Sequence, residues 1–322
     1  MDAPQYVPVN IESIETGVFP DVALYILRGN NHVLYKNHGR DFSVRDSERL
    51  KENGVEFLYV SPEDMEIITD YMESNAGRFL KSQKLNNEAK GRMIYQTSVN
   101  FVGDIFTSPE KVGELERSKR LMENLLLYLS SDPAALTSLE SVMSHNYHTF
   151  VHSLQVTTLS ILMHSEAYLL SKDEMLDVGM GTLLHDFGKI FIPKEILGKT
   201  RKLTDHEVEI IKRHPEDGYN YLKENTRLGE VSLSIVRYHH ERNNGSGFPL
   251  GLTEKQIPRS AQIGGICDVY CTLAVDKTGR KALPPEMILH IMRQEMKGAF
   301  SPRLLDVLES IACVEDSAQL VL

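Results

Sequence analysis

The sequence contains no tryptophan, only three cysteines and no long hydrophobic run. Because the cysteines are odd in number and form no Cys-x-x-Cys pair, they offer no disulfide framework and indicate a reducing compartment. No stretch approaches the roughly 18 apolar residues of a membrane span. The first residues also lack the basic and then apolar pattern of a signal peptide. We therefore expect a cytoplasmic protein that has no membrane segment.

The chain is acidic, with a formal net charge of -10. This charge argues against general nucleic-acid binding, which needs clustered lysine and arginine. Charged residues make up 25% and hydrophobic residues 41% of the chain, as in soluble globular proteins. Its 322 residues are enough for two domains, each with its own core.

The first part of the chain reads as short strands and turns. Residues 22–27, 33–35 and 57–60 are rich in β-forming side chains, and a helix over 47–53 precedes the last of them. Residues 1–70 are therefore predicted to form a small α+β module. No residue in this module marks a catalytic site, so we expect a regulatory or interaction role.

A helical connector is predicted over residues 71–134. Within it, apolar residues and one lysine follow the 3-4-3-4-3 spacing of a coiled-coil seam: Val112, Leu115, Lys119, Met122, Leu126 and Leu129. The stripe has two interpretations, a homodimer through helix 112–129 or a helix packed on its own domain. Pro133 then ends the helical pattern.

Histidines gather in the second half of the chain, where residues 135–322 show helical spacing almost throughout. The candidate donors are His148, His152, His185, Asp186, His214, His239, His240 and Asp268. This number of imidazoles and carboxylates exceeds what one metal ion can use. It suits two borderline metals that share a bridging carboxylate, an architecture used to hydrolyse phosphate esters.

Spacing indicates how these donors converge. His148 and His152 lie four residues apart and leave the same face of a helix. His185 and Asp186 point about 100° apart around a helix that should end at Gly188, so Asp186 could bridge to a second ion. His239 and His240 are expected where the helix over 231–238 ends, followed by a tight glycine-containing loop over 243–249.

The motifs together resemble the HD-GYP family, a subgroup of the HD phosphohydrolase superfamily. They are His-Asp-x-Gly-Lys at 185–189, His-Pro-x-x-Gly at 214–218, His-His-Glu at 239–241 and Gly-x-Gly-Phe-Pro at 245–249. The likeness covers about residues 140–300. It implies an all-helical domain with a di- or trinuclear iron or manganese centre that hydrolyses cyclic di-GMP. Segment 5–70 also resembles the small N-terminal modules that such proteins carry, which implies signalling partners.

The predicted chain is thus α+β overall, with an all-α HD-type metal-binding domain at 135–322. The resemblance also implies a role for each matching residue. One metal would bind His152, His185, Asp186 and Asp268, and the other His214, His239 and His240, with Asp186 as bridge. Asp186 and Lys189 would be the catalytic residues, with Lys189 at the scissile phosphate. The remaining implied substrate contacts are Lys277, Arg280 and Phe248.

Several positions depart from the family pattern and bear on substrate recognition. They are Phe248 for the signature tyrosine, Asn244 for an aspartate, Lys277 for an arginine, Cys271 for an aspartate, Thr278-Gly279 for Pro-Tyr and His148 for a glutamate. A lysine in place of arginine loses a bidentate fork to phosphate. His148 would bind a third ion or cap the pocket.

Three functions therefore stay open: a cyclic di-GMP phosphodiesterase weakened by its loop, a nucleotide receptor or scaffold with an intact metal site, and a phosphohydrolase of ordinary nucleotides. Smaller features are open as well. Glu241 would orient an imidazole or be solvated, and Cys267 and Cys271 would be core thiols or ligands. His164 is expected at the surface or in packing.

Overall fold

The computed structural model describes residues 6–29, 31–113, 115–132, 135–144, 149–199, 201–276 and 280–313. His148 and Lys277 lie outside these residues, so the predictions made for them are not addressed by the structure. The chain forms two compact units. Unit 1 comprises Met1–Thr97 and Asn124–Val142, and unit 2 comprises Ser98–Glu123 and Met143–Leu322.

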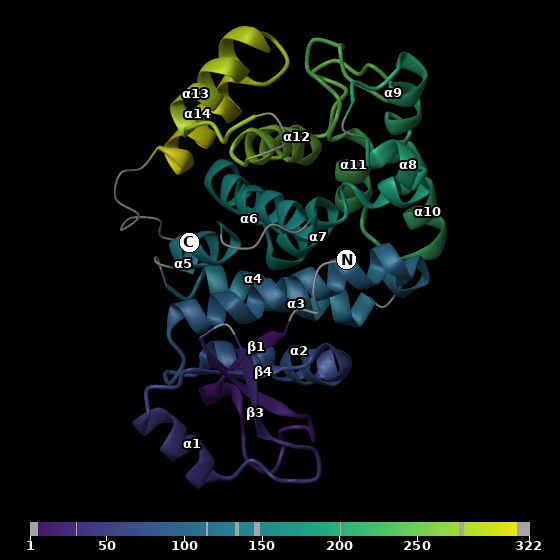
Figure 1. Ribbon diagram of the computed structural model, residues 1–322. Helices are drawn as coiled ribbons and strands as arrows, with labels where there is room; N and C mark the ends of the chain where they lie inside the picture. Colours follow the sequence, from purple (N-terminus) through teal and green to yellow (C-terminus); the bar gives the residue numbers. More distant parts are fainter. Residues whose placement is uncertain are drawn as a thin grey trace. The chain divides into compact units, whose positions relative to one another are not determined.

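Unit 1 contains a four-stranded antiparallel sheet in the order β1-β4-β2-β3 (Figure 1). Its elements are β1 (Val7–Asn10), η1 (Ile11–Ser13), β2 (Leu24–Arg28), β3 (Asn31–Lys36), α1 (Val44–Glu52), β4 (Phe57–Val60), η2 (Pro62–Asp64) and α2 (Met65–Lys81). Val9, Leu24 and Leu58 are buried on one face of the sheet. Helix α1 begins earlier than predicted, because Ser43 and Asp46 form a capping box at its start. The expected small α+β module is confirmed.

Two long helices follow, α3 (Asn87–Thr107) and α4 (Leu115–Leu129), joined by η3 (Pro109–Gly113), and α5 (Ala135–Ser144) comes next. In the predicted seam, Met122 and Leu129 are buried within the chain and Lys119 is exposed. A Cβ atom on Gly179 would lie 2.8 Å from the sulfur of Met122. Contacts within the same chain thus account for the burial of these residues of the stripe, and the homodimer stays a prediction.

Unit 2 carries the helices of the second half of the chain. They are α6 (Thr149–Ala167), α7 (Lys172–Leu183), η4 (Phe187–Phe191), α8 (Lys194–Leu197), α9 (Asp205–Ile211), α10 (His214–Asn225), α11 (Glu230–Tyr238), α12 (Arg259–Leu273), α13 (Pro285–His290), η5 (Ile291–Glu295) and α14 (Pro302–Ala312). Among its described residues there is no β-strand of the kind found in unit 1, and Asn244 and Thr253 form an isolated β-bridge. The all-helical expectation is confirmed.

Helices α6, α7, α11 and α12 pack against one another in unit 2 (Figure 1). Cys267 and Cys271 lie in the hydrophobic core that α6 and α12 share with α13 and α14, which confirms them as core thiols. Burial raises the pKa of the Cys267 thiol well above its usual value, so the thiol stays protonated. In the described part of the chain, no helix is long and apolar enough to cross a bilayer.

A buried histidine in this unit predicts a pH-dependent stability. Burial lowers the pKa of His164 from 6.5 to about 4, although its Nδ1–H donates to the carbonyl oxygen of Ser160. The unfolded chain then binds more protons between pH 6.5 and 4, so stability falls as the pH falls through this window. From pH 7 to pH 5 we expect His164 to cost about 2 kcal/mol of unfolding free energy.

Urea unfolding of the metal-free chain at the two pH values measures this effect. His164→Leu should flatten the pH dependence by about that amount, whereas Ser165→Ala, a change on the same helix that removes no titratable group, should leave it as in the wild type. Equal pH dependence in wild type and His164→Leu would contradict the assignment.

Candidate metal centre

His185 and Asp186 lie in a turn, not on a helix as the sequence predicted. Helix α7 ends at Leu183, and the short helix η4 begins at Phe187. Gly188 explains the early end, because a Cβ atom there would lie 1.9 Å from the carbonyl oxygen of His214. A Cβ atom on Gly218 would similarly lie 2.9 Å from the nitrogen of Gly188. The two glycines therefore let η4 and α10 touch through their backbones, which brings Asp186 to His214.

The other candidate ligands come from four elements around this turn. His214 is the first residue of α10, and His239 and His240 directly follow α11, as predicted. His152 lies on α6 and Asp268 on α12, helices that pack side by side. The structure thus brings together all seven histidines and aspartates assigned to metal binding from the sequence.

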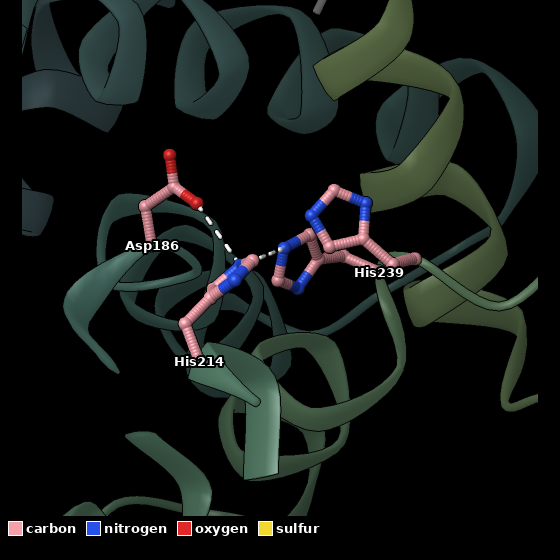
Figure 2. Close-up of side chains that lie close together, drawn as sticks. Asp186, His214 and His239 are labelled. Carbon is pink, nitrogen blue, oxygen red and sulfur yellow. Dashed lines mark hydrogen bonds and ion pairs between the residues drawn. The ribbon is translucent and has the colours of Figure 1, made fainter. Parts of the chain in front are cut away.

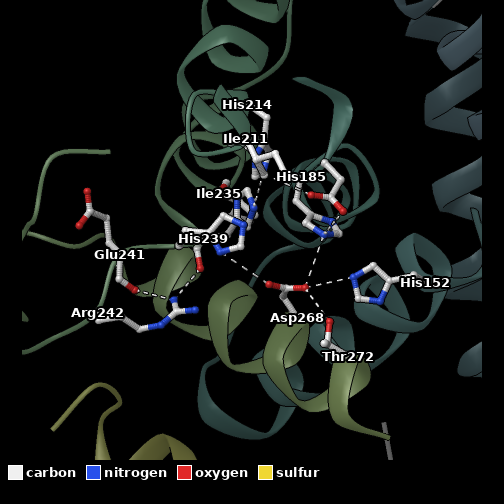
Figure 3. Close-up of polar contacts among 12 residues, drawn as sticks. His152, His185, Ile211, His214, Ile235, His239, Glu241, Arg242, Asp268 and Thr272 are labelled. Atoms are coloured by element: carbon white, nitrogen blue, oxygen red, sulfur yellow. Dashed lines mark hydrogen bonds and ion pairs between the residues drawn. The ribbon is translucent and has the colours of Figure 1, made fainter. Parts of the chain in front are cut away.

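These seven residues form two groups of donor atoms. One is Asp186, His214, His239 and His240, and the other is His152, His185 and Asp268. Within each group the donor atoms lie within 4.8 Å of one another. Figure 2 shows Asp186, His214 and His239 converging in the first group, and Figure 3 shows Asp268 facing His152 and His185 in the second.

Asp186 faces both groups with different oxygens. Its Oδ1 lies 3.3 Å from Nε2 of His214, in the first group. Its Oδ2 lies 3.4 Å from Nε2 of His185, in the second. Asp268 Oδ1 lies 3.0 Å from Nε2 of His152. One carboxylate between two sets of imidazoles is the arrangement that a bridged pair of metal ions requires.

Backbone contacts fix the proton positions on three of the rings. Nδ1 of His185, His214 and His239 lies within 2.9 Å of the carbonyl oxygens of Thr182, Ile211 and Val236, respectively. Since a carbonyl only accepts, each Nδ1 carries the proton and donates it. In the neutral form of each ring, Nε2 therefore presents a lone pair to the pocket, the usual state of a metal-binding histidine.

Two contacts at Nε2 show that a cation fits this pocket. Nε2 of His214 and Nε2 of His239 lie 3.4 Å apart and face the same pocket. Nε2 of His185 is buried and has no hydrogen-bond partner among the described residues. Buried polar atoms normally have partners. A metal ion would satisfy these nitrogens, so the donor set fits divalent metals.

The electrostatics also favour deprotonated donors. Burial lowers the pKa of His239 well below its usual range and that of His240 to about 3. Burial would raise the pKa of Asp186, but the charges of Lys189 and His185 outweigh it and hold the pKa low. His185 differs, because Asp186 outweighs its burial and raises its pKa. A cation bound there would displace the proton from His185.

The three described residues that the sequence assigned to substrate binding each contact a different group: a carboxylate, an imidazole ring or backbone carbonyls. Nζ of Lys189 lies 2.5 Å from Oδ2 of Asp186, and its side chain is 36% exposed. Phe248 stacks on His240 with 4.5 Å between ring centroids. The guanidinium of Arg280 donates to the carbonyl oxygens of Leu273 (2.8 Å) and Val275 (3.2 Å), at and just beyond the end of α12. A phosphate would have to compete with these carbonyls, and the substrate role of Arg280 stays a prediction.

The carboxylate of Glu241 is not solvated, and no imidazole among the described residues hydrogen-bonds to it directly. Its side chain is buried, and its carboxylate accepts hydrogen bonds from the backbone nitrogens of Leu250 (2.7 Å) and Leu252 (2.8 Å). Arg242 was not singled out in the sequence, yet its guanidinium donates to the carbonyl oxygens of His239 (3.0 Å) and Glu241 (2.8 Å) (Figure 3). The position of Arg242, two residues after the His-His pair, was the one signal in the sequence that could have pointed to it.

Comparisons with known proteins identify the family of the domain that carries this site. A family model described as an HD domain matches residues 134–304. A cyclic di-GMP phosphodiesterase of Pseudomonas aeruginosa is 32% identical over 185 residues, which are 57% of this chain and 44% of the relative. A 3′3′-cGAMP-specific phosphodiesterase of Vibrio cholerae is 33% identical over 142 residues, 44% of this chain and 27% of the relative. The chain thus spans less than half the length of either relative.

A solved structure shows the same fold over nearly the whole chain. It is an HDG"Y"P protein from Bdellovibrio bacteriovorus, with a TM-score of 0.68 and 19% identity, and the match covers 95% of this chain and 99% of that one. The family model spans more than half of the 322 residues. The chain belongs to the HD domain family.

Proposed function

We propose that the chain is a metal-dependent phosphodiesterase that hydrolyses a cyclic dinucleotide, with cyclic di-GMP as the first candidate. The observation that carries this proposal is the carboxylate of Asp186, whose two oxygens face two separate groups of ligands. The substrates named for the relatives in Pseudomonas aeruginosa and Vibrio cholerae support the substrate class.

Two divalent ions, iron or manganese, would occupy the centre. His152, His185 and Asp268 would hold one, and His214, His239 and His240 the other, with Asp186 between them. When bound, such ions supply Lewis-acid activation of a phosphoryl group and of water. His148 would add a third ion or cap the pocket, as the sequence leaves open.

The chain's own cations would bind and orient the phosphodiester. Burial would lower the pKa of Lys189, but the charge of Asp186 outweighs it and raises the pKa, so the side chain is an ammonium at neutral pH. Its partial exposure lets it reach a phosphate oxygen next to the metal ligands. Lys277 and Arg280 are proposed as further phosphate contacts.

The second candidate function is a receptor or scaffold that binds the dinucleotide and turns it over weakly. Phe248 in place of a tyrosine favours it, because the phenol that would donate to the substrate is missing. An absent hydrogen bond to a charged group costs roughly 1.5–3 kcal/mol.

Turnover and binding assays of the metal-loaded chain separate the candidates. Cyclic di-GMP, 3′3′-cGAMP, linear pGpG and a mononucleotide are compared at equal metal content. Hydrolysis of a cyclic dinucleotide supports the phosphodiesterase. Tight binding of the cyclic dinucleotides without hydrolysis identifies a receptor, and turnover of mononucleotides alone points to an ordinary nucleotide phosphohydrolase.

We also propose that residues 1–70 form a regulatory or interaction module that binds signalling partners and that metal binding resides in residues 135–322. A fragment of residues 135–322 is expected to retain its metal, as measured by elemental analysis of the purified fragment. A folded fragment that binds no metal would contradict this division of the chain.

A further inference from the structure

His240 is held differently from the other histidines of the centre. His185, His214 and His239 each donate Nδ1–H to a backbone carbonyl, and Nε2 of His152 lies 3.0 Å from Asp268. Among the described residues, no hydrogen bond reaches the ring of His240. Its Nδ1 lies 3.9 Å from Oδ2 of Asp268, which is beyond hydrogen-bonding distance.

The ring of His240 is instead in contact with an aromatic side chain. Phe248 stacks on His240 with 26° between the ring planes and 4.5 Å between the centroids. The backbone nitrogen of Phe248 also donates to the carbonyl oxygen of His240 (3.2 Å). Phe248 therefore contacts both the ring and the backbone of this one histidine.

The loop that carries Phe248 is pinned against the His-His-Glu segment. The buried carboxylate of Glu241 accepts hydrogen bonds from Leu250 and Leu252, so the chain must return past Phe248 to His240. Gly247 allows the close approach. A Cβ atom at this position would lie 2.5 Å from the carbonyl oxygen of His240 and 2.4 Å from the nitrogen of Arg242.

We propose that Phe248 is a positioning residue for His240, and that Glu241 acts with it by holding the loop in place. If the proposed metal centre is correct, the loop that carries Phe248 therefore contributes to metal binding as well as to substrate binding. Partners that orient a ligating histidine commonly change metal affinity by about 10- to 100-fold when they are removed. The face of Phe248 that meets His240 is also unavailable to a substrate base.

The role predicts a selective loss of metal from the group that contains His240. Phe248→Leu removes the aromatic face, and we expect it to weaken binding of one of two Co²⁺ ions by about 10- to 100-fold. Phe248→Tyr keeps the ring and should bind both ions like the wild type. Glu241→Gln should weaken the same ion to a smaller degree, because a neutral amide holds the loop less firmly.

Titration of the metal-free full chain with Co²⁺, followed by visible absorption, measures both affinities. His214→Ala identifies which ion belongs to this group, since His214 ligates only there. Leu250→Ala is the matched control, because this exposed side chain lies in the same loop and its backbone contact to Glu241 is kept. The urea midpoint of each metal-free variant is measured alongside.

A weaker ion at the His214 position in Phe248→Leu, with wild-type behaviour in Phe248→Tyr and Leu250→Ala, supports the role. Equal affinities in Phe248→Leu and wild type overturn it and leave the proposed hydrolysis standing. Equal weakening of both ions, or a midpoint lowered together with metal binding, also overturns it. If Phe248→Leu shows the selective loss but the metal-loaded wild type hydrolyses no cyclic dinucleotide, the proposed function is refuted and the positioning role stands.

Discussion

Replacing Asp186 with asparagine is expected to lower metal occupancy in both groups and to reduce the proposed hydrolysis of cyclic di-GMP by about 10³-fold. The carboxylate is the one described side chain whose two oxygens lie within 3.4 Å of imidazole nitrogens in the two groups. An amide removes the charge and leaves a single oxygen donor. Metal activation contributes several kcal/mol of transition-state stabilisation, and each 1.36 kcal/mol is a factor of ten in rate.

Elemental analysis and turnover of the purified variant test this expectation together. His214→Ala should affect mainly one ion, since His214 lies in one group only. Asp217→Asn is the matched control, because Asp217 lies in the first turn of the same helix and pairs with Arg213. An Asp186→Asn protein that retains two ions would show that Asp186 does not bridge them.

The sequence predicted the candidate donors that converge in the structure because the signals for them are local. An adjacent His-Asp, a His-Pro at a helix start and a His-His after an apolar helical segment each place imidazoles at an element's end. The fold class was predictable for the same reason, since helical spacing persists throughout the second half. Three of the four strands were also predicted, whereas β1 and the order of the strands in the sheet were not.

What the sequence could not give depends on contacts between distant segments. His185 lies outside a helix because Gly188 must touch the backbone at His214, a constraint that helical periodicity does not encode. Glu241 looked like a partner for an imidazole, but the return of the loop to Leu250 and Leu252 decides where its carboxylate points. The same return brings Phe248 onto His240.

Lys189→Met is expected to lower the turnover number by about 10²- to 10³-fold while both metal ions remain bound. A preorganised donor at the developing charge of a transition state contributes about 2.7–4 kcal/mol in enzymes that use one. Lys189 is suited to this task because its ammonium is fixed beside Asp186 and stays charged at neutral pH. Methionine is an unbranched side chain of nearly the same length, and it removes the ammonium group with its charge and its hydrogen-bond donors.

The comparison with Asp186→Asn makes this prediction specific. Lys189 pairs with Oδ2 of Asp186 at 2.5 Å and would therefore compete with a metal ion for the same oxygen. Its removal should therefore leave metal affinity unchanged or raise it, whereas loss of Asp186 lowers it.

Lys194→Met, at an exposed lysine of α8, is the control for loss of a positive charge. If Lys189→Met loses metal along with turnover, then Lys189 acts by holding Asp186 in place and does not meet the phosphate. Unchanged turnover with full metal would place the substrate beyond its reach.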